Sequence, residues 1–211
     1  MAKLFLGTRE VTPVIPFSSG KYQLLQRIKD DTNTEIGTVS GFVKNSNDTE
    51  YAVVCLDAQY RTFGQFLSAR DAVNIPNLNN WVSSYWYSAK QTATENCDTI
   101  LAFCNTNNYT SSGVSNCRTV SFTIGGVTYQ GQLPTIRELF DITTHRAEIE
   151  TLDTTATSYP SYNFSTARNC IVSSVYSGQY IFFFNTGGRM TDAVTTQSGT
   201  CVTVLELPNS L

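Results

Sequence analysis

Short apolar segments separated by glycine-containing turns fill the C-terminal part of the chain. They cover residues 170–176, 180–185, 189–196 and 201–207, with Gly178, Gly188 and Gly199 in the turns between them. Segments of this length at a spacing of about ten residues are typical of antiparallel strands joined by tight turns, so we predict a meander. Residues 181–184 are apolar at every position, which predicts a strand that is central in its sheet or covered on both faces.

The segment that begins at Pro134 predicts the start of an amphipathic helix. Pro134 disfavours a helix before it, and Thr135 and Glu138 form a T-x-x-E capping box, in which each side chain accepts from the backbone amide of the other residue. The positions that then share one helical face are Ile136, Leu139, Phe140 and Thr143. Such a stripe usually marks a core, so we expect this helix to lie on a sheet.

Two pairs of segments predict β-hairpins. The first joins residues 36–43 to 51–56 through a polar turn at 45–48, and the second joins 120–124 to 127–130 across Gly125-Gly126. A Gly-Gly connection favours the two-residue turns that match strand twist. Residues 22–31 allow either a short helix with Leu25 and Ile28 inward or a strand at a sheet edge.

Two further segments have a less regular pattern. Residues 62–73 place Phe66, Ala69 and Val73 on one side of a helix, so we predict a helix that ends before Pro76. Residues 94–118 are rich in Asn, Thr, Ser and Cys, and we predict a long loop there. The pattern as a whole predicts an α+β domain with antiparallel sheets and two helices.

The N-terminal residues predict an extended arm, because Pro13 and Pro16 exclude a helix there. The apolar residues of this arm are Leu4, Phe5, Leu6, Val11 and Val14. Such an arm either attaches the chain to a partner or forms an edge strand of its own domain. Residues 17–20 (Phe-Ser-Ser-Gly) predict a flexible joint, so we assign residues 1–20 to an attachment arm and its joint and residues 21–211 to one domain.

The composition narrows the choice of partners. Charged residues make up 15% of the 211 residues, and the formal net charge is −3; an average soluble domain has ~25% charged residues. Because Lys and Arg do not cluster, we expect no nucleic-acid partner. No run approaches the ~20 apolar residues of a membrane span, so we expect no membrane insertion. The first residues do not resemble a secretory signal, so we expect the protein to be made in the cytoplasm.

The titratable residues do not suggest an enzyme. The chain has one histidine and six cysteines, without a C-x-x-C pair, a G-x-S-x-G motif or a paired-carboxylate motif. We therefore expect no catalytic residue, no metal and no cofactor. The cysteines are expected to be mostly reduced and to act as small apolar residues, and Cys170 and Cys201 are the first candidates if one pair is oxidised.

An aromatic cluster at Trp81, Tyr85, Trp86 and Tyr87 has two interpretations. These rings could stack on the sugar of a host-surface glycan without a metal, or they could pack in a core or a subunit interface. Together with the low charge and the apolar strand at 181–184, the cluster leads us to expect a homotrimer or homodimer.

One motif carries a resemblance to a known fold. Leu133, Pro134, Thr135, Glu138 and Leu139 form L-P-T-x-x-E-L, and Ser173-Ser174 follows on a predicted strand. This combination resembles the bacterial and phage variant of the C-type-lectin-like fold, over residues ~36–207. Gly131-Gln132 and Ile171-Val172 stand where that variant usually has Trp-Arg and Tyr-Trp. The calcium-binding motifs of true C-type lectins do not occur, nor does the Arg-rich surrounding of the two cysteines in formylglycine-generating enzymes, which share this fold.

The N-terminal part carries a second resemblance. The arm sequence K-L-F-L-G-T-x-x-V-T-P-V-I is similar to N-terminal segments of tailed-phage virion proteins, in particular those of phages that infect Bacteroides. Residues 36–42 and 50–60 resemble head-fibre and tail-fibre proteins of such phages. The resemblance implies a structural virion protein, a head-fibre, decoration or tail-fibre subunit that the arm anchors to capsid or tail protein. The alternative is a metal-independent carbohydrate-binding adhesin or receptor-binding module.

Overall fold

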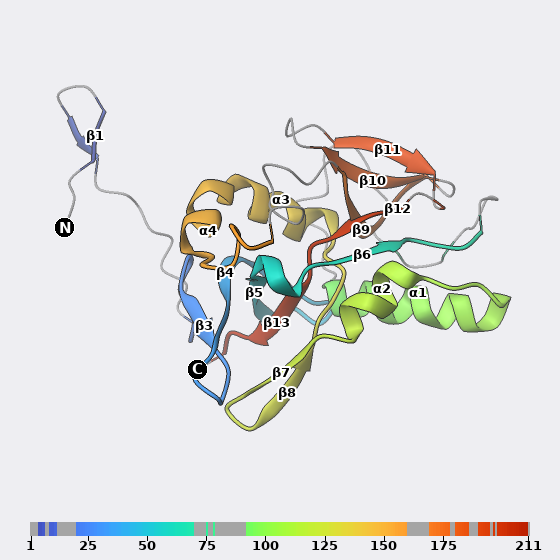
Figure 1. The fold of residues 1–211 in the computed structure, drawn as a ribbon, viewed down its shortest axis with the longest axis horizontal. Coiled ribbons are helices and arrows are strands. Elements are labelled where there is room, and N and C mark those ends of the chain that lie inside the picture. The colour runs from blue at the N-terminus through green and yellow to red at the C-terminus, as the bar shows by residue number, and fades with distance from the viewer. Residues whose placement is uncertain are drawn as a thin grey trace.

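The computed structural model describes residues 4–6, 9–11, 20–69, 75, 78, 92–159, 169–177, 180–185, 190–194, 196 and 198–210. These residues form a mixed α+β structure with antiparallel sheets, as the sequence predicts (Figure 1).

A four-stranded antiparallel sheet forms one half of the body. Its strands are β3 (Arg27–Lys29), β4 (Glu35–Lys44), β5 (Glu50–Leu56) and β13 (Val204–Pro208), in the order β13-β5-β4-β3. The predicted hairpin between β4 and β5 is confirmed, with Val43 opposite Tyr51. β3 lies at the edge, so the strand-edge alternative for residues 22–31 is the correct one.

A five-stranded sheet forms the other half. Its strands are β6 (Thr62–Gln65), β9 (Asn169–Ser177), β10 (Tyr180–Asn185), β11 (Met190–Val194) and β12 (Ser198–Cys201), in the order β11-β10-β9-β12-β6. The prediction of a meander is confirmed for β9, β10 and β11, and β10 has a partner on each side. It is wrong for the end of the chain: β12 lies parallel to β9 on its far side, and β13 joins the other sheet.

The predicted helix at 62–73 is wrong in its first part, because residues 62–65 form strand β6. The outer edge of β6 is covered by α2 (Ser112–Arg118). The side-chain amide of Asn116 donates to the Phe63 carbonyl (2.8 Å), and the backbone amide of Gln65 donates to the Ser112 hydroxyl (2.9 Å). Gly64 permits this approach, since a Cβ there would lie 2.5 Å from the backbone nitrogen of Gly113. An unpaired strand edge is unfavourable, and α2 satisfies this one. Residues 70–73 lie outside the described part of the chain.

The predicted loop at 94–118 is also wrong, because it contains α1 (Ala93–Asn107) and α2. Helix α1 begins with a capping box: the Glu95 amide donates to the Thr92 hydroxyl (3.3 Å), and the Thr92 amide donates to the Glu95 carboxylate (3.0 Å). It ends at Asn108, whose left-handed backbone (φ 56°) terminates the helix. The described residues thus form more than the two helices expected.

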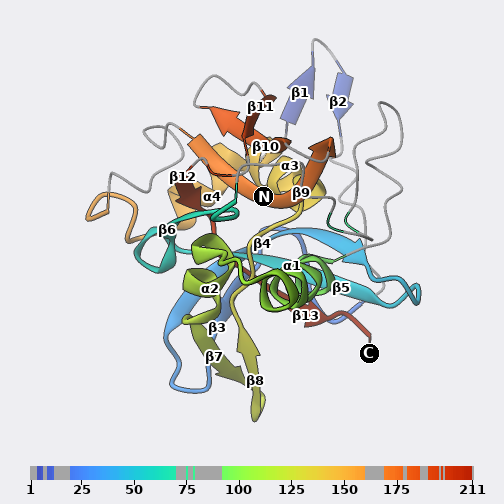
Figure 2. The ribbon, with the colours of Figure 1, turned by 90° about the vertical axis from the view of Figure 1, so that its right-hand side faces the viewer.

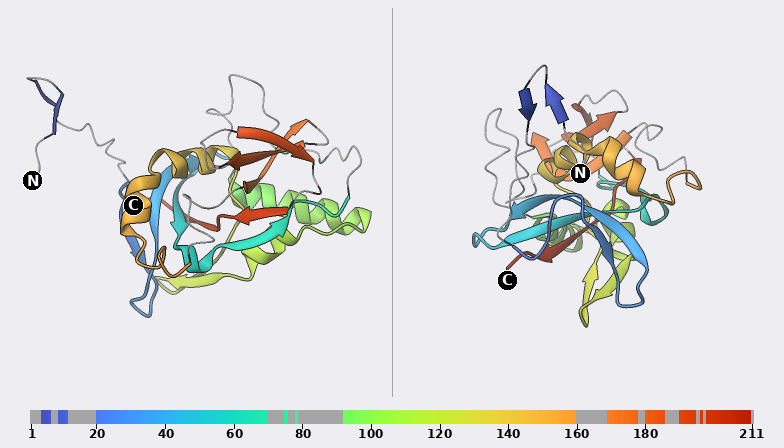
Figure 3. Two further views of the ribbon diagram at one scale, coloured as in Figure 1. Left: turned by 45° about the horizontal axis from the view of Figure 1, so that its top comes forward. Right: turned by 90° about the vertical axis from the view of Figure 1, so that its left-hand side faces the viewer.

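Helix α3 (Ile136–Thr144) confirms the helix predicted from Thr135, including its capping box. It is followed by α4 (Arg146–Leu152), and a short 3₁₀ helix, η1 (Ala58–Tyr60), follows β5. The right-hand view of Figure 3 shows α3 and α4 on one face of the four-stranded sheet and the β7–β8 hairpin on the other.

The hairpin of β7 (Ser121–Ile124) and β8 (Val127–Gln130) is confirmed, with Gly125 and Gly126 at φ 61° and 78°. Two consecutive residues at positive φ give the turn that favours glycine at both positions. The carboxylate of Asp31 accepts from both glycine amides, at 2.6 and 2.8 Å. The hairpin projects from the body beside β3 (Figure 2). The hydrogen bonds to Asp31 hold its turn close to the end of β3.

Three buried apolar clusters hold the elements together. The first lies between α1, α2 and the five-stranded sheet and includes Ile100 and Ile171. The second lies between α3, α4 and the four-stranded sheet, around Leu139 and Val53. The third lies on the other face of that sheet, where Val54 faces the β7–β8 hairpin. Adjacent residues of β5 thus face different cores, as strand alternation requires.

The N-terminal arm is not extended throughout. β1 (Leu4–Leu6) and β2 (Arg9–Val11) form an antiparallel pair, with Leu4 opposite Val11, and in the described part of the chain they join neither larger sheet.

Gly20, the first residue of the continuously described body, lies against Asn209 near the C-terminal end. Asn209 accepts from the amide of Lys21 through its carbonyl (3.2 Å) and from the amide of Tyr22 through its side chain (2.9 Å). A Cβ on Gly20 would lie 2.2 Å from the Asn209 side chain. Residues 20–22 and the residue that follows β13 therefore form one clamp.

Candidate functional site

The residues predicted for attachment and glycan binding fall largely outside the described part of the chain. Those not described are Val14, Trp81, Tyr85, Trp86 and Tyr87. Leu4, Phe5, Leu6 and Val11 lie in β1 and β2, where the structure describes the backbone pairing only. The functional assignment of these residues stays a prediction.

The residues of the L-P-T-x-x-E-L motif and the serine pair form one buried unit. The amide of Ser173 donates to the carbonyl of Pro134 (2.8 Å), and the hydroxyl of Ser174 accepts from the amide of Ile136 (3.0 Å). From α1, the amide group of Asn96 donates to the carbonyl of Ser173 (3.0 Å). β9 therefore satisfies the backbone groups at the start of α3 that the helix itself leaves unpaired.

The structure also brings together two carboxylates that the sequence did not link. Glu138 of α3 and Glu206 of β13 both accept from the amide of Ala93, at 3.2 and 2.6 Å. Glu206 also accepts from the amide and the hydroxyl of Thr94, at 3.0 and 2.5 Å. The first turn of α1 thus rests on two carboxyl groups, which suits the positive end of a helix dipole.

The environment of this pair favours a bound proton. Burial raises the pKa of Glu138 well above its usual value, and the charge of Glu206 and a hydrogen bond with it act in the same direction. The amides of Thr135 and Ala93 oppose this shift but do not reverse it. The surroundings of Glu138 therefore favour its protonated form.

A proton shared between two carboxyl groups is a feature of several hydrolytic enzymes. Here Glu138 is 0% exposed and Glu206 is 7% exposed, and the pair already accepts from the amides of Ala93, Thr94 and Thr135. Because both carboxyl groups are buried and already hydrogen-bonded, we assign them a structural role: they connect α1, α3 and β13. The sequence offered one clue, since Glu206 interrupts the apolar run from Val204 to Leu207.

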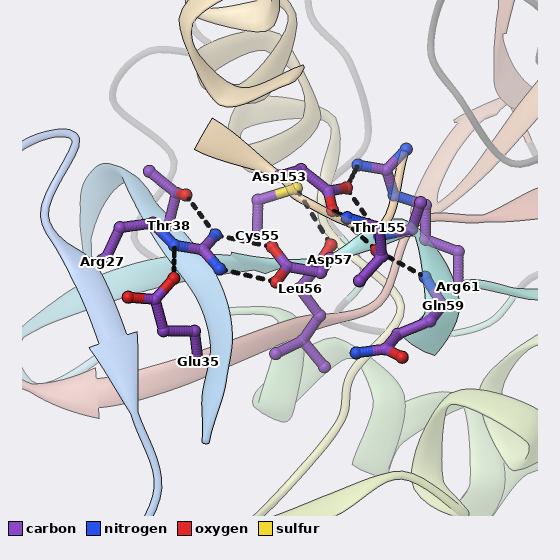
Figure 4. Close-up of polar contacts among 11 residues, drawn as sticks. Arg27, Glu35, Thr38, Cys55, Leu56, Asp57, Gln59, Arg61, Asp153 and Thr155 are labelled. Atoms are coloured by element: carbon purple, nitrogen blue, oxygen red, sulfur yellow. Dashed lines mark hydrogen bonds and ion pairs between the residues drawn. The ribbon is translucent and has the colours of Figure 1, made fainter. Parts of the chain in front are cut away.

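A second polar network crosses the four-stranded sheet near η1 (Figure 4). Arg27 of β3 makes two hydrogen bonds to the carboxylate of Asp57, at 2.6 and 2.7 Å, one to Glu35 (3.3 Å) and one to the Thr38 hydroxyl (3.0 Å). Burial raises the pKa of Asp57 in spite of the hydrogen bonds and charge of Arg27, which act in the opposite direction. A bidentate Arg–carboxylate pair gives both geometry and energy to this contact.

Farther along the same network, Asp153 joins the end of α4 to η1 (Figure 4). Its carboxylate accepts from the Ala58 amide (2.7 Å) and from the Thr155 amide and hydroxyl (2.8 and 2.6 Å). A nitrogen of Arg61 lies 3.8 Å from it, and both side chains are fully buried. The carboxylates of Asp57 and Asp153 are thus already hydrogen-bonded to other residues of the chain. Among the described residues, no group of three or more His, Cys, Asp and Glu is placed to hold a metal.

All six cysteines are buried with free thiols. Cys170 and Cys201, the pair first considered from the sequence, face different cores. Thr200 is the register partner of Cys170 on the parallel strand β9, so the next residue, Cys201, points to the opposite face. Burial raises the pKa of Cys55 to about 11 and that of Cys170 to about 12, which makes both thiols poor nucleophiles at neutral pH.

Comparison of the chain with protein-family models gave no match, and comparisons with curated proteins and with solved structures gave none either. Of the helices in the described residues, none has the length and apolar character needed to cross a bilayer.

Proposed function

We propose that this chain is a structural protein of a tailed-phage virion, a head-fibre, decoration or tail-fibre subunit that displays a C-type-lectin-like domain and is attached by its N-terminal residues. The single observation that most supports the proposal is the buried unit formed by the motif residues. Pro134, Ile136, Ser173 and Ser174 are hydrogen-bonded to one another across α3 and β9. The segments that carry the resemblance are therefore joined to each other by buried hydrogen bonds.

The N-terminal segment supports an attachment role. β1 and β2 pair with each other, and residues 20–22 are bonded to Asn209 near the other end of the chain. An element that pairs with itself, followed by a fixed starting point of the domain, suits a peptide whose apolar residues are buried against another protein.

Substitutions in the full-length chain test the attachment. Leu4→Ser, Leu6→Ser and Val11→Ser together should leave the far-UV circular dichroism spectrum and the thermal midpoint unchanged but remove the protein from purified particles, because the apolar contacts with capsid or tail protein are lost. Arg9→Ala is the matched control in the same strand pair and should keep incorporation. Unchanged incorporation of the triple variant would reject attachment through the arm.

Two further measurements separate the alternative. Binding to a glycan array that is lost in Trp81→Ala or Trp86→Ala, in a protein that does not copurify with particles, would favour the carbohydrate-binding adhesin. Light scattering at micromolar concentration tests the predicted homotrimer or homodimer, and a monomeric mass would contradict it.

A further inference from the structure

Two thiols from distant parts of the chain lie close together in the core between α1, α2 and the five-stranded sheet. Cys117 lies in α2 and Cys201 at the end of β12, and both side chains are fully buried. The thiol of Cys201 donates to the carbonyl of Gly199 (3.8 Å), and each of the two thiols shifts the pKa of the other.

The packing of α2 on the sheet fixes this contact. Cys201 lies opposite Thr62 in the β6–β12 ladder, and the Thr62 hydroxyl is 3.8 Å from the sulfur of Cys117. One helical turn before Cys117, a Cβ added to Gly113 would lie 3.5 Å from the sulfur of Cys201. The closeness of the two sulfurs therefore follows from the backbone arrangement as well as from the side-chain rotamers.

The two thiols differ in reactivity. Burial would raise the pKa of Cys117, but the neighbouring Cys201 thiol and the hydrogen bonds from Thr203 and Thr62 together lower it below the usual value. The interaction with Cys117, followed by burial, raises the pKa of Cys201 well above the usual value. Because the thiolate is the nucleophile, Cys117 is the better attacking group and Cys201 the resolving one.

We propose that Cys117 and Cys201 are a covalent modification site, at which a peroxide forms an intramolecular disulfide between α2 and β12. The Cys117 thiolate attacks one oxygen of hydrogen peroxide, the O–O bond breaks, and the sulfenic acid and hydroxide form; the hydroxide takes up the thiol proton as water. The Cys201 sulfur then attacks the sulfenic sulfur, the S–O bond breaks, and a second water leaves with the Cys201 proton. Two thiols are oxidised and one peroxide is reduced to two waters.

The remaining thiols should stay reduced. Burial keeps the pKa of Cys55 at about 11 and that of Cys170 at about 12, and it raises the pKa of Cys97 well above its usual value. The inference is independent of the proposed function, since it depends only on the packing of α2 against β12.

The test uses the full chain treated with hydrogen peroxide, then denatured without reductant, alkylated and mapped by mass spectrometry. We expect four alkylated cysteines and one linked peptide pair, Cys117 with Cys201. The thermal midpoint should rise by about 5–10 °C, because the cross-link closes a long loop. A full set of six thiols after oxidation, or a disulfide between any other two cysteines, would overturn the proposal.

Variants test the order of the steps. Cys201→Ser should trap the sulfenic acid on Cys117, where dimedone labels it, and Cys117→Ser should abolish both the label and the disulfide. Cys97→Ser, a buried thiol of the same core, is the matched control and should still form the disulfide. Dimedone labelling at another cysteine in Cys201→Ser would contradict the role of Cys117. The wild-type peptide map decides the disulfide even if a variant fails to fold.

Discussion

Replacing Glu138 by glutamine should make the protein more stable at neutral pH than the wild type while leaving it nearly unchanged in acid. The side chain is fully buried beside Glu206, and burial raises its pKa well above the unfolded value of 4.5. A glutamine keeps the main contact, because its carbonyl accepts from the Thr135 amide, which now lies 2.7 Å from the Glu138 carboxylate. Its amide group replaces the oxygen that accepts from the Ala93 amide at 3.2 Å, but that amide still donates to Glu206 at 2.6 Å.

The direction of the pH dependence follows from linkage. A folded-state pKa above the unfolded value means that the native state binds the proton more tightly, so this contribution is complete below pH 4.5 and is lost as pH rises toward the folded-state pKa. Within that window the wild type loses about 1.4 kcal/mol per pH unit, so an interval of two units is worth roughly 3 kcal/mol. The glutamine variant has no proton to lose at this position and should not show this decline.

Urea unfolding at several pH values between about 4 and 8 measures the effect as a free energy of unfolding. Glu206→Gln should behave oppositely and destabilise the protein by roughly 3 kcal/mol, because an amide group would then face the donors of Ala93 and Thr94. Glu148→Gln, at an exposed position of α4, controls for the change in net charge. A difference between Glu138→Gln and the wild type that stays constant across the pH range would refute the raised pKa of Glu138.

Two further substitutions test other contacts by the same unfolding measurement. Asp57→Ala should destabilise by about 3–5 kcal/mol because it leaves the largely buried Arg27 without its bidentate partner, whereas Glu35→Gln, at the more exposed partner, should cost below about 1 kcal/mol; equal losses would contradict the network. Gly126→Ala should cost about 1–2 kcal/mol from its φ of 78° alone, since no atom lies near its Cβ position. Gly64→Ala should cost more, because its Cβ would meet the backbone of α2, and the opposite ranking would refute that packing.

The elements that the sequence predicted correctly depend on signals between neighbours in the chain. The turn at Gly125-Gly126 and the capping box of Thr135 and Glu138 are each complete within a few residues, and the structure confirms both. The β4–β5 hairpin likewise depends on alternation and a nearby turn.

Helix α1 was missed although a local signal was present. Thr92 and Glu95 form the same T-x-x-E box as Thr135 and Glu138, but the following residues are poor helix formers. The helix is instead stabilised by distant groups: Glu206 from β13 accepts from its first turn, and Ile100 packs in the core with Ile171. Tertiary contacts of this kind outweigh local propensity, and a single sequence does not contain them.

The pairings of the candidate site are non-local for the same reason. β12 and β13, near the end of the chain, join two different sheets. β13 brings Glu206 close to Glu138, and β12 brings Cys201 close to Cys117. Strand periodicity placed Cys201 on a strand but could not choose its neighbours; the structure places it in the core that contains Cys117, whereas Cys170 lies in another core.

The clamp between residues 20–22 and Asn209 determines how the body would respond to mechanical load. Tension on the N-terminal residues would reach Lys21 and Tyr22, whose amides are bonded to Asn209, and would pass from there into β13 and its ladder with β5. The pulling force would therefore enter the four-stranded sheet at two of its edges, β3 and β13, before any strand could be peeled away. A load applied at the N-terminal end would therefore be shared between the two edge strands of this sheet.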